Sequence, residues 1–362
     1  MENRIEHVDG LRGIAILSVI LYHAYSRWPA LVSLPYGERY AHFFGWGWLG
    51  VELFFIISGF VIFMSLDKCD SFGQFIGKRW LRLFPAMLIA TALIFITAPL
   101  VNRPDGLPTF SQAVPGLTLI DPRWLSRMGG SGEMLEGSFW SLFAEVKFYV
   151  FAGAIYFTLG RTWAILGLLA GFVGYWLCFP LDFQGPQWWA YLYDTPYWAW
   201  FACGALFYEW KRTDDWRLFA VAMIIGIVAS AVPMPGAGGI KNMDWLPLAG
   251  LPFVLLFAAA LRYSRVQRIL RSRWLLFLGF VSYPLYLIHE QAVVGLSMSL
   301  GRNVSQGWLS GVIPLLPIAI VIAASWVIAK FWEKPVRRAI SSSAELLARL
   351  ALQHVRMGTA NK

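Results

Sequence analysis

Charged residues are scarce in this sequence. Asp, Glu, Lys and Arg make up 14% of its 362 residues, whereas 58% are hydrophobic and 17% are aromatic. Ordinary soluble domains carry about 25% charged residues, so this chain has too few charges to cover the surface of a soluble globule. Its hydrophobicity also excludes a disordered chain. The composition therefore predicts an integral membrane protein.

Several familiar chemical motifs are also missing. The three cysteines, Cys69, Cys178 and Cys203, have the spacing of neither a disulfide framework nor a metal-ligand set. No P-loop, dinucleotide fingerprint or nucleophile elbow occurs, so we expect no bound metal and no nucleotide-driven pump. The polar N-terminal stretch enters a long apolar run without a cleavage site, which indicates a retained first helix rather than a signal peptide.

Long apolar runs fill the chain. About 20 apolar residues cross a bilayer as a helix, and ten runs of that kind can be placed, at 11–29, 45–66, 83–101, 138–159, 162–181, 187–209, 217–233, 245–262, 274–299 and 308–332. They predict an all-α, polytopic membrane domain at residues 1–338, followed by a tail at 339–362. The tail has a serine run and then apolar residues at helical spacing, which is typical of a helix lying on the membrane surface.

Basic residues are distributed unevenly around these spans. Ten spans put both termini on one side, and alternating the loops places 21 of the 30 Lys and Arg on that side and 7 on the other. Arg12 and Lys147 lie at or within the membrane. The positive-inside rule then predicts that both termini are cytoplasmic. The net charge of +9 is therefore explained by topology and gives no indication of nucleic-acid binding.

Ionisable side chains within the predicted spans are candidate functional residues, because charge is costly there. They are Arg12, His23, Glu52, Glu145, Lys147, Asp194, Glu209, His289 and Glu290.

Arg12 and His23 share one face of the first helix, because 11 residues correspond to about three turns and about 16 Å along the axis. A neutral imidazole in an apolar setting suits a general base, and a permanent cation near the inner boundary suits an anionic ligand. Together they suggest a site that opens to the cytoplasm with its chemistry deeper in the membrane. The alternative is an arginine that extends to the interface and a histidine that bonds a neighbouring helix.

A basic cluster enters the third span in the segment GKRWLRLFPAM. It contains Lys78, Arg79 and Arg82, and the two arginines share a helix face. Such a cluster suits phosphate groups, but it is equally typical of a cytoplasmic helix end that contacts anionic lipid. The arginines between positions 262 and 273 form a similar stripe, which we interpret as an orientation anchor facing lipid.

Glu145 lies about two turns into the fourth span, accompanied by Trp140 and Ser141. Lys147 is two positions away, and side chains at that spacing do not face each other on a helix. We therefore expect Glu145 to meet an arginine or histidine of another helix. The alternative is a structural ion pair that holds helices together.

Three further groups lie towards the outer half of the predicted spans, where an acceptor can enter: Glu52, His289 and Glu290. Pro284 precedes the last two and breaks or kinks its helix, which membrane helices tolerate where they line a cavity. Asp194, close to Pro196, is interpreted as part of a short outer turn.

Six segments, taken in order, resemble the acyltransferase 3 family. HVDGLRGIAILSVILYH is similar to the first helix of that family, GVELFFIISGFVIF to the second, KRWLRLFPAM to the basic start of the third and FWSLFAEVKFYVF to a later aromatic segment. SYPLYLIHEQ and FWEKPVRR resemble its closing helices, so the matches extend from residue 7 to residue 338. Lys147 and Pro284 depart from the family pattern. We expect no additional esterase-like domain of the kind that many members carry.

The resemblance implies a membrane enzyme that O-acylates surface glycans. Its donor would be cytoplasmic acyl-CoA, usually acetyl-CoA, and its acceptor an extracytoplasmic hydroxyl, for example on lipopolysaccharide O-antigen or exopolysaccharide. The location would be the inner membrane of a bacterium. By this resemblance, the CoA phosphates would be bound by Arg12, Lys78, Arg79 and Arg82. His23 would act as the base or as a transient acyl carrier, and Glu145 would orient or charge-balance His23 or a nearby arginine. The acceptor would be bound by Glu52, Trp140, Ser141, His289 and Glu290.

A transporter or flippase of a glycan or lipid-linked precursor is the alternative. Intramembrane His, Glu and Arg suit proton-coupled transport, and tryptophan-rich helices suit sugar stacking. No inverted repeat is detectable, which disfavours many transporter folds. Acyl transfer by purified protein distinguishes the two. The oligomeric state and the acceptor are not indicated by the sequence.

Overall fold

The computed structural model describes residues 5–28, 37–130, 132–178, 193–232, 247–301 and 311–343, and these residues are helices and connecting segments with no strand among them. The all-α fold class is therefore confirmed. Within these described ranges, four helical stretches are long and apolar enough to cross a membrane, namely Tyr40–Leu66, Phe72–Leu100, Gly137–Thr158 and Leu315–Ser343. The number of spans, their orientation and the boundary at residue 338 stay predictions.

Each of the ten predicted apolar runs overlaps one helix of at least 12 residues. These are α1 (Glu6–Tyr25), α4 (Gly50–Leu66), α5 (Phe72–Thr97), α8 (Trp140–Thr158), α9 (Arg161–Cys178), α11 (Trp198–Thr213), α12 (Trp216–Ala231), α13 (Leu251–Arg262), α15 (Arg273–Gly301) and α16 (Leu315–Val327). The shorter elements are α3 (Gly37–Phe44), η1 (Gly45–Leu49), η2 (Ala98–Leu100), α6 (Phe110–Thr118), α7 (Pro122–Arg127), η3 (Gly137–Phe139), η5 (Thr195–Tyr197), α14 (Ser264–Leu270) and the π-helical η7 (Ile328–Trp332).

Two helices differ from expectation in ways that matter for the site. α5 begins at Phe72 rather than at residue 83, because Ser71 caps it by accepting a hydrogen bond from the Gln74 amide. The basic cluster therefore lies inside α5 and not before it. Pro284 lies within α15 without ending the helix. The predicted surface helix of the tail falls largely on residues 344–362, outside the described residues.

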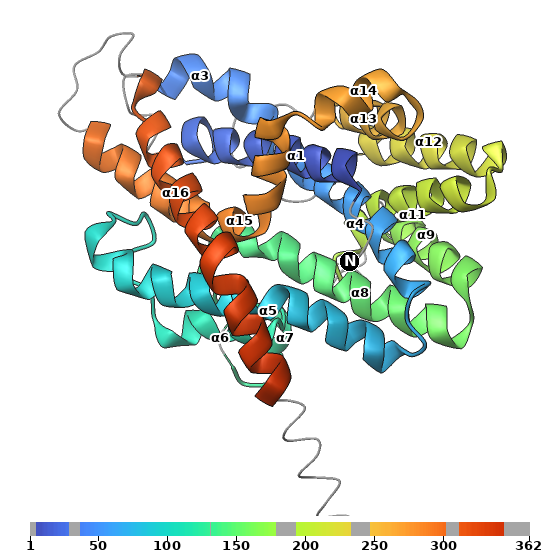
Figure 1. Ribbon diagram of the computed structural model, residues 1–362, viewed down its shortest axis with the longest axis horizontal. Coiled ribbons are helices and arrows are strands. Elements are labelled where there is room, and N and C mark those ends of the chain that lie inside the picture. Colours follow the sequence, from blue (N-terminus) through green and yellow to red (C-terminus); the bar gives the residue numbers. More distant parts are fainter. Residues whose placement is uncertain are drawn as a thin grey trace, which may run out of the picture.

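α1 runs through the middle of the molecule, packed along α15 on one side and against α4 on another (Figure 1). Glycines permit this close packing: a Cβ on Gly13 of α1 would overlap the backbone of Leu275 in α15. The α4–α11 interface works in the same way, because Gly59 lies against the Phe201 backbone. Small residues at such contacts are typical of membrane helices. As a result, α1 carries its polar side chains in the interior of the bundle.

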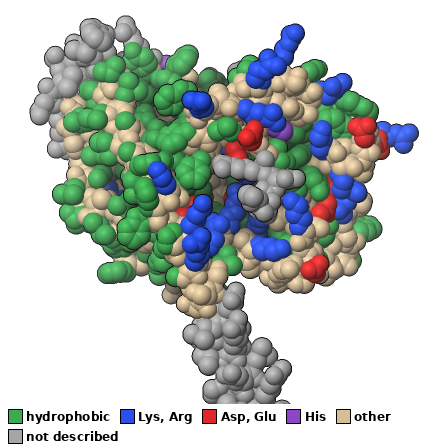
Figure 2. All heavy atoms as spheres, in the orientation of Figure 1, with side chains coloured by type: hydrophobic (Ala, Val, Ile, Leu, Met, Phe, Trp, Pro, Cys, Tyr) green, Lys and Arg blue, Asp and Glu red, His purple; other side chains and the backbone are tan. Residues whose placement is uncertain are grey.

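One face of the molecule gathers basic side chains. Figure 2 shows Lys and Arg over the centre and one side of this face, whereas hydrophobic side chains cover much of the other side. Exposed basic residues among those that the structure describes include Lys78 and Arg82 of α5 and Arg265 and Arg268 of α14.

Candidate active site

A first cavity, of about 100 Å³, is lined by three arginines. Arg12 comes from α1, and Arg79 and Arg82 come from α5, while α8 contributes Glu145. We call this space the arginine cavity. Guanidinium groups exceed carboxylates in this lining, so the cavity suits an anionic ligand.

Neighbouring polar groups hold the lining of the arginine cavity in place. Arg12 donates to the Asp9 carboxylate one turn earlier at 2.8 Å, and Arg79 donates to the Ser65 hydroxyl at 2.8 Å. Glu145 accepts a hydrogen bond from Ser58 of α4. Of the two kinds of partner predicted for Glu145, arginine shares its cavity and His23 does not.

Lys78 stands apart from the two arginines of its cluster. Its ammonium donates to the Lys68 carbonyl oxygen at 3.2 Å and lies 3.4 Å from the Cys69 sulfur. Lys78 is not among the described residues that line the arginine cavity. The structure thus brings Arg12, Arg79 and Arg82 together and leaves Lys78 on the exposed surface.

A second cavity, of about 440 Å³, contains His23. Its lining includes the carboxylates Glu52 and Glu290 and aromatic rings such as Trp140 and Tyr197. We call it the histidine cavity. Glu52 is only 3% exposed, and its Oε2 atom has no hydrogen-bond partner within the part of the chain that the structure describes.

His23 is held by three neighbours. Its Nδ1 atom lies 2.9 Å from the Val19 carbonyl oxygen and 3.1 Å from Nε2 of His289. Its Nε2 atom lies 3.6 Å from Oε1 of Glu290. The backbone N–H of Ser138 donates to the other oxygen of Glu290. Of the predicted acceptor residues, Glu290 therefore faces His23 in the cavity, whereas His289 lies behind it.

Phe55 and Tyr286 line both cavities and form the wall between them. The Tyr286 hydroxyl donates to the Ser138 carbonyl oxygen at 2.7 Å and lies 2.6 Å from the Ser141 hydroxyl. Ser141 lines the arginine cavity, although the sequence led us to expect it on the acceptor side. Two hydrogen bonds thus hold Tyr286 at the boundary.

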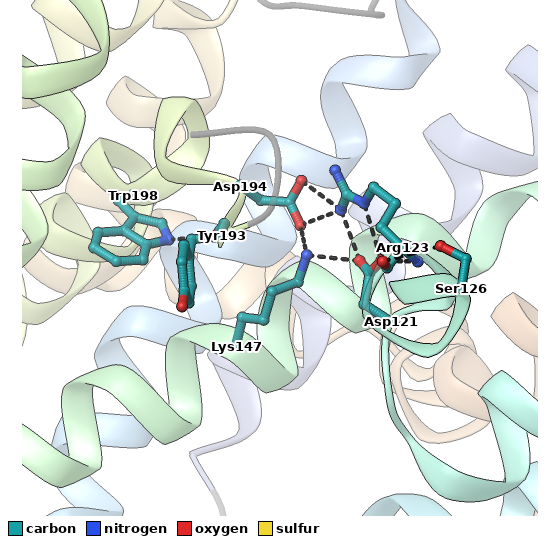
Figure 3. Close-up of polar contacts among 7 residues, drawn as sticks. All are labelled: Asp121, Arg123, Ser126, Lys147, Tyr193, Asp194 and Trp198. Carbon is teal, nitrogen blue, oxygen red and sulfur yellow. Dashed lines mark hydrogen bonds and ion pairs between the residues drawn. The ribbon is translucent and has the colours of Figure 1, made fainter. Parts of the chain in front are cut away.

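A cluster of four charges borders the histidine cavity (Figure 3). Lys147 rises from α8 between Asp121, at 2.6 Å, and Asp194, and Arg123 contacts both carboxylates at 2.6 and 2.8 Å. Burial acts to raise the pKa of Asp121, but Arg123 and Lys147 hold that pKa below its ordinary value. Asp121 also caps α7 by accepting from the Arg123 amide.

The sequence did not reveal this charge cluster. Asp194 lies in a turn, as expected, but its carboxylate also belongs to the cluster, and Asp121 and Arg123 were not singled out. One signal was available: Lys147 and Asp194 were both ionisable residues within predicted spans, and buried charges pair with opposite charges.

Comparison with known proteins identifies the chain. A family model described as an acyltransferase domain matches residues 5–330. The chain belongs to this acyltransferase family. It is 26% identical to the acyltransferase MdmB of Streptomyces mycarofaciens, over 92% of this chain and 92% of MdmB. It is 27% identical to BcsY of Komagataeibacter xylinus, provisionally named a membrane-bound transacylase, over 89% of this chain and 81% of BcsY.

A third relative is a Staphylococcus aureus (strain COL) protein, SACOL0978, provisionally named an O-acetyltransferase. It is 29% identical over 43% of this chain and 25% of its own length. No solved structure matches the chain. The family predicted from the six segments is therefore confirmed, and the acyltransferase combines an arginine cavity and a histidine cavity across a wall of two side chains.

Proposed function

We propose that this acyltransferase moves an acyl group, most simply acetyl, from cytoplasmic acyl-CoA to a hydroxyl of an extracytoplasmic glycan. The observation that carries the proposal is the pair of cavities meeting at Phe55 and Tyr286, with guanidinium groups in one and His23 in the other. A charged nucleotide does not cross a bilayer, whereas a small acyl group needs only to pass the side chains of Phe55 and Tyr286.

The proposed orientation has ten helices across a bacterial inner membrane and both termini in the cytoplasm. The basic face in Figure 2 supports it through the positive-inside rule. The arginine cavity then opens to the cytoplasm and the histidine cavity to the outside.

The donor's phosphates would bind Arg12, Arg79 and Arg82, because a planar guanidinium donates two parallel hydrogen bonds to phosphate. The arginine cavity, at about 100 Å³, is far smaller than the several hundred Å³ of a typical ligand pocket, roughly 300–1,000 Å³. We therefore propose that the adenosine stays outside beside Arg82, that the diphosphate reaches the three arginines, and that only the narrow pantetheine arm enters further.

The acceptor would occupy the histidine cavity, whose volume of about 440 Å³ suits a sugar unit. Trp140 and Tyr197 offer ring faces for stacking, and Glu52 offers a carboxylate to hydroxyl groups. The name of the staphylococcal relative favours O-acetyl transfer. Lipopolysaccharide O-antigen and exopolysaccharide are the acceptors that we would test first.

In the proposed reaction, Nε2 of His23 takes the proton of the acceptor hydroxyl while that oxygen attacks the thioester carbonyl carbon. The new C–O bond forms, the C–S bond breaks, and the departing CoA thiolate takes the proton back from His23. Glu290, 3.6 Å from Nε2, stabilises the imidazolium that forms between these events. If His23 instead carries the acyl group, an acylated protein accumulates when acyl-CoA is supplied without acceptor.

The test is transfer of labelled acetyl from acetyl-CoA to surface glycan by purified protein. His23→Ala and His23→Gln should lower the transfer rate by about 10²–10⁴-fold, the contribution of a well-placed base. Wild-type rates in both variants would remove His23 from the reaction. A wild-type protein that binds glycan but never consumes acyl-CoA would support the transporter or flippase alternative. Mass spectrometry of glycans from wild-type and deletion strains then identifies the acyl group and the acceptor.

A further inference from the structure

A second imidazole lies directly behind His23. His289 of α15 is 0% exposed, and it is not among the described residues that line either cavity. From this position it cannot contact an acceptor in the histidine cavity. We propose that His289 is a positioning residue, which holds His23 in the tautomer whose Nε2 lone pair faces the acceptor. This inference rests on the proposed function and specifies how its base is prepared.

The hydrogen-bond partners determine which nitrogen atoms carry hydrogen. A neutral imidazole has one N–H, and a carbonyl oxygen can only accept. Nδ1 of His289 lies 2.9 Å from the Tyr286 carbonyl oxygen, so this nitrogen carries the hydrogen. Nε2 of His289 is consequently a lone pair that can only accept.

The same reasoning extends to His23. Its Nδ1 atom faces two acceptors, the Val19 carbonyl oxygen at 2.9 Å and the bare Nε2 of His289 at 3.1 Å. Nδ1 of His23 therefore carries the hydrogen and shares it between them. The remaining nitrogen, Nε2, is left unprotonated beside Glu290.

His289 is needed because Glu290 favours the opposite tautomer. A carboxylate 3.6 Å from Nε2 attracts a hydrogen to that nitrogen, and charge-assisted hydrogen bonds are roughly twice as strong as neutral ones. The Val19 carbonyl alone opposes this effect with one neutral bond. The lone pair of His289 adds a second acceptor on the Nδ1 side, and it also holds the plane of the His23 ring.

Three variants at position 289 test this role. His289→Leu removes the acceptor, His289→Asn is polar but too short to reach His23, and His289→Gln extends an amide oxygen towards the site. We expect Leu and Asn to lower kcat for acetyl transfer by about 10–100-fold, by analogy with the loss when the hydrogen-bond partner that orients a metal-bound histidine is removed. Gln should restore kcat to within about fivefold of wild type. The KM values for acceptor and acetyl-CoA should stay within twofold in all variants, because His289 touches neither ligand.

The outcomes separate the possible roles. A raised acceptor KM with unchanged kcat would make His289 an acceptor-binding residue and overturn the proposal. A wild-type kcat in both His289→Asn and His289→Leu would also overturn it. Equal losses of kcat in His289→Asn and His289→Gln would overturn it as well, because a hydrogen-bond acceptor within reach of the His23 Nδ1 atom would then make no difference. Binding of acetyl-CoA checks that each variant is folded, and the Asn and Gln pair suffices if the Leu variant does not fold. If His23→Ala itself keeps the wild-type rate, His23 is not the base and this inference falls with that role. If the wild-type protein never consumes acetyl-CoA, the proposed function itself fails.

Discussion

The arginine cavity is lined by three guanidinium groups and one carboxyl group, Glu145, whereas the charge cluster that borders the histidine cavity pairs Lys147 and Arg123 with Asp121 and Asp194. The rest of the histidine cavity adds two carboxyl groups, Glu52 and Glu290, and one guanidinium group, Arg27. Surplus positive charge attracts an anion, whereas a lining with more carboxyl groups than cations does not attract an anion and offers acceptors to the hydroxyl groups of an uncharged ligand. The two cavities therefore differ in the way expected of a phosphate-bearing donor and a hydroxyl acceptor.

Burial also separates the two regions. The Arg12 side chain is 18% exposed and Arg82 lies at the surface, although Arg79 is only 8% exposed, so water still screens part of the charge in the arginine cavity. The Lys147 side chain is 4% exposed and its two carboxylate partners are similarly buried. Breaking such a buried pair is expensive because one charge is left without compensation. Mutations in the charge cluster should therefore affect stability, and mutations in the arginine cavity should affect binding.

The largest expected effect follows from that difference. Lys147→Met should reduce the free energy of unfolding at pH 7 by about 3–5 kcal/mol, because it leaves two buried carboxylates with only Arg123. The ionised Asp121 carboxylate contributes to the stability of the folded protein at pH 7, since the folded-state pKa of that carboxyl is lowered. It is lost only as the pH falls through this lowered value. Thermal unfolding in detergent measures the change.

The double variant Lys147→Met with Asp194→Asn provides the matched control for the charge cluster. It removes one charge of each sign and leaves the Arg123–Asp121 pair. We expect it to unfold at a higher temperature than Lys147→Met alone, because the two changes act on one network. If the double variant is less stable than the single one, the charges do not compensate each other, and the comparison between the cavities loses its basis.

Features that depend on spacing within one helix could be predicted from the sequence. Arg12 and His23 were expected about 16 Å apart on one face of a helix, and they line the two different cavities from α1. The apolar runs likewise located the long helices. Helical periodicity and hydrophobicity are local properties, so they are visible without knowledge of the tertiary structure.

Contacts between helices could not be predicted in this way. His289 was expected to shape the acceptor site, but close packing of α1 on α15 puts it behind His23. The partners of Lys147 are 26 and 47 residues away along the chain. Which helices meet depends on close approaches such as that of Gly13 to Leu275, and a single sequence does not reveal which glycine faces which partner.

A smaller effect, on binding alone, is expected in the arginine cavity. Arg79→Ala and Arg82→Ala should each raise the KM for acetyl-CoA by about 10-fold or more, since a hydrogen bond to a charged group contributes about 1.5–3 kcal/mol. Lys78→Ala should change this KM by less than threefold, because Lys78 contacts the Lys68 carbonyl and not the cavity. Equal effects at all three positions would indicate a diffuse surface attraction and would contradict a defined donor site.

The smallest expected effect tests the wall between the cavities. Tyr286→Phe removes the hydroxyl that donates to Ser138 and contacts Ser141, and a lost hydrogen bond of about 0.5–1.5 kcal/mol should loosen the wall. We expect hydrolysis of acetyl-CoA without acceptor to rise by about two- to tenfold, because water then reaches the thioester more often. Tyr283→Phe is the control. The Tyr283 hydroxyl donates to the Leu83 carbonyl oxygen, and Tyr283 lines the arginine cavity but not the histidine cavity. Equal hydrolysis by the two variants would mean that the Tyr286 hydroxyl does not separate donor from acceptor.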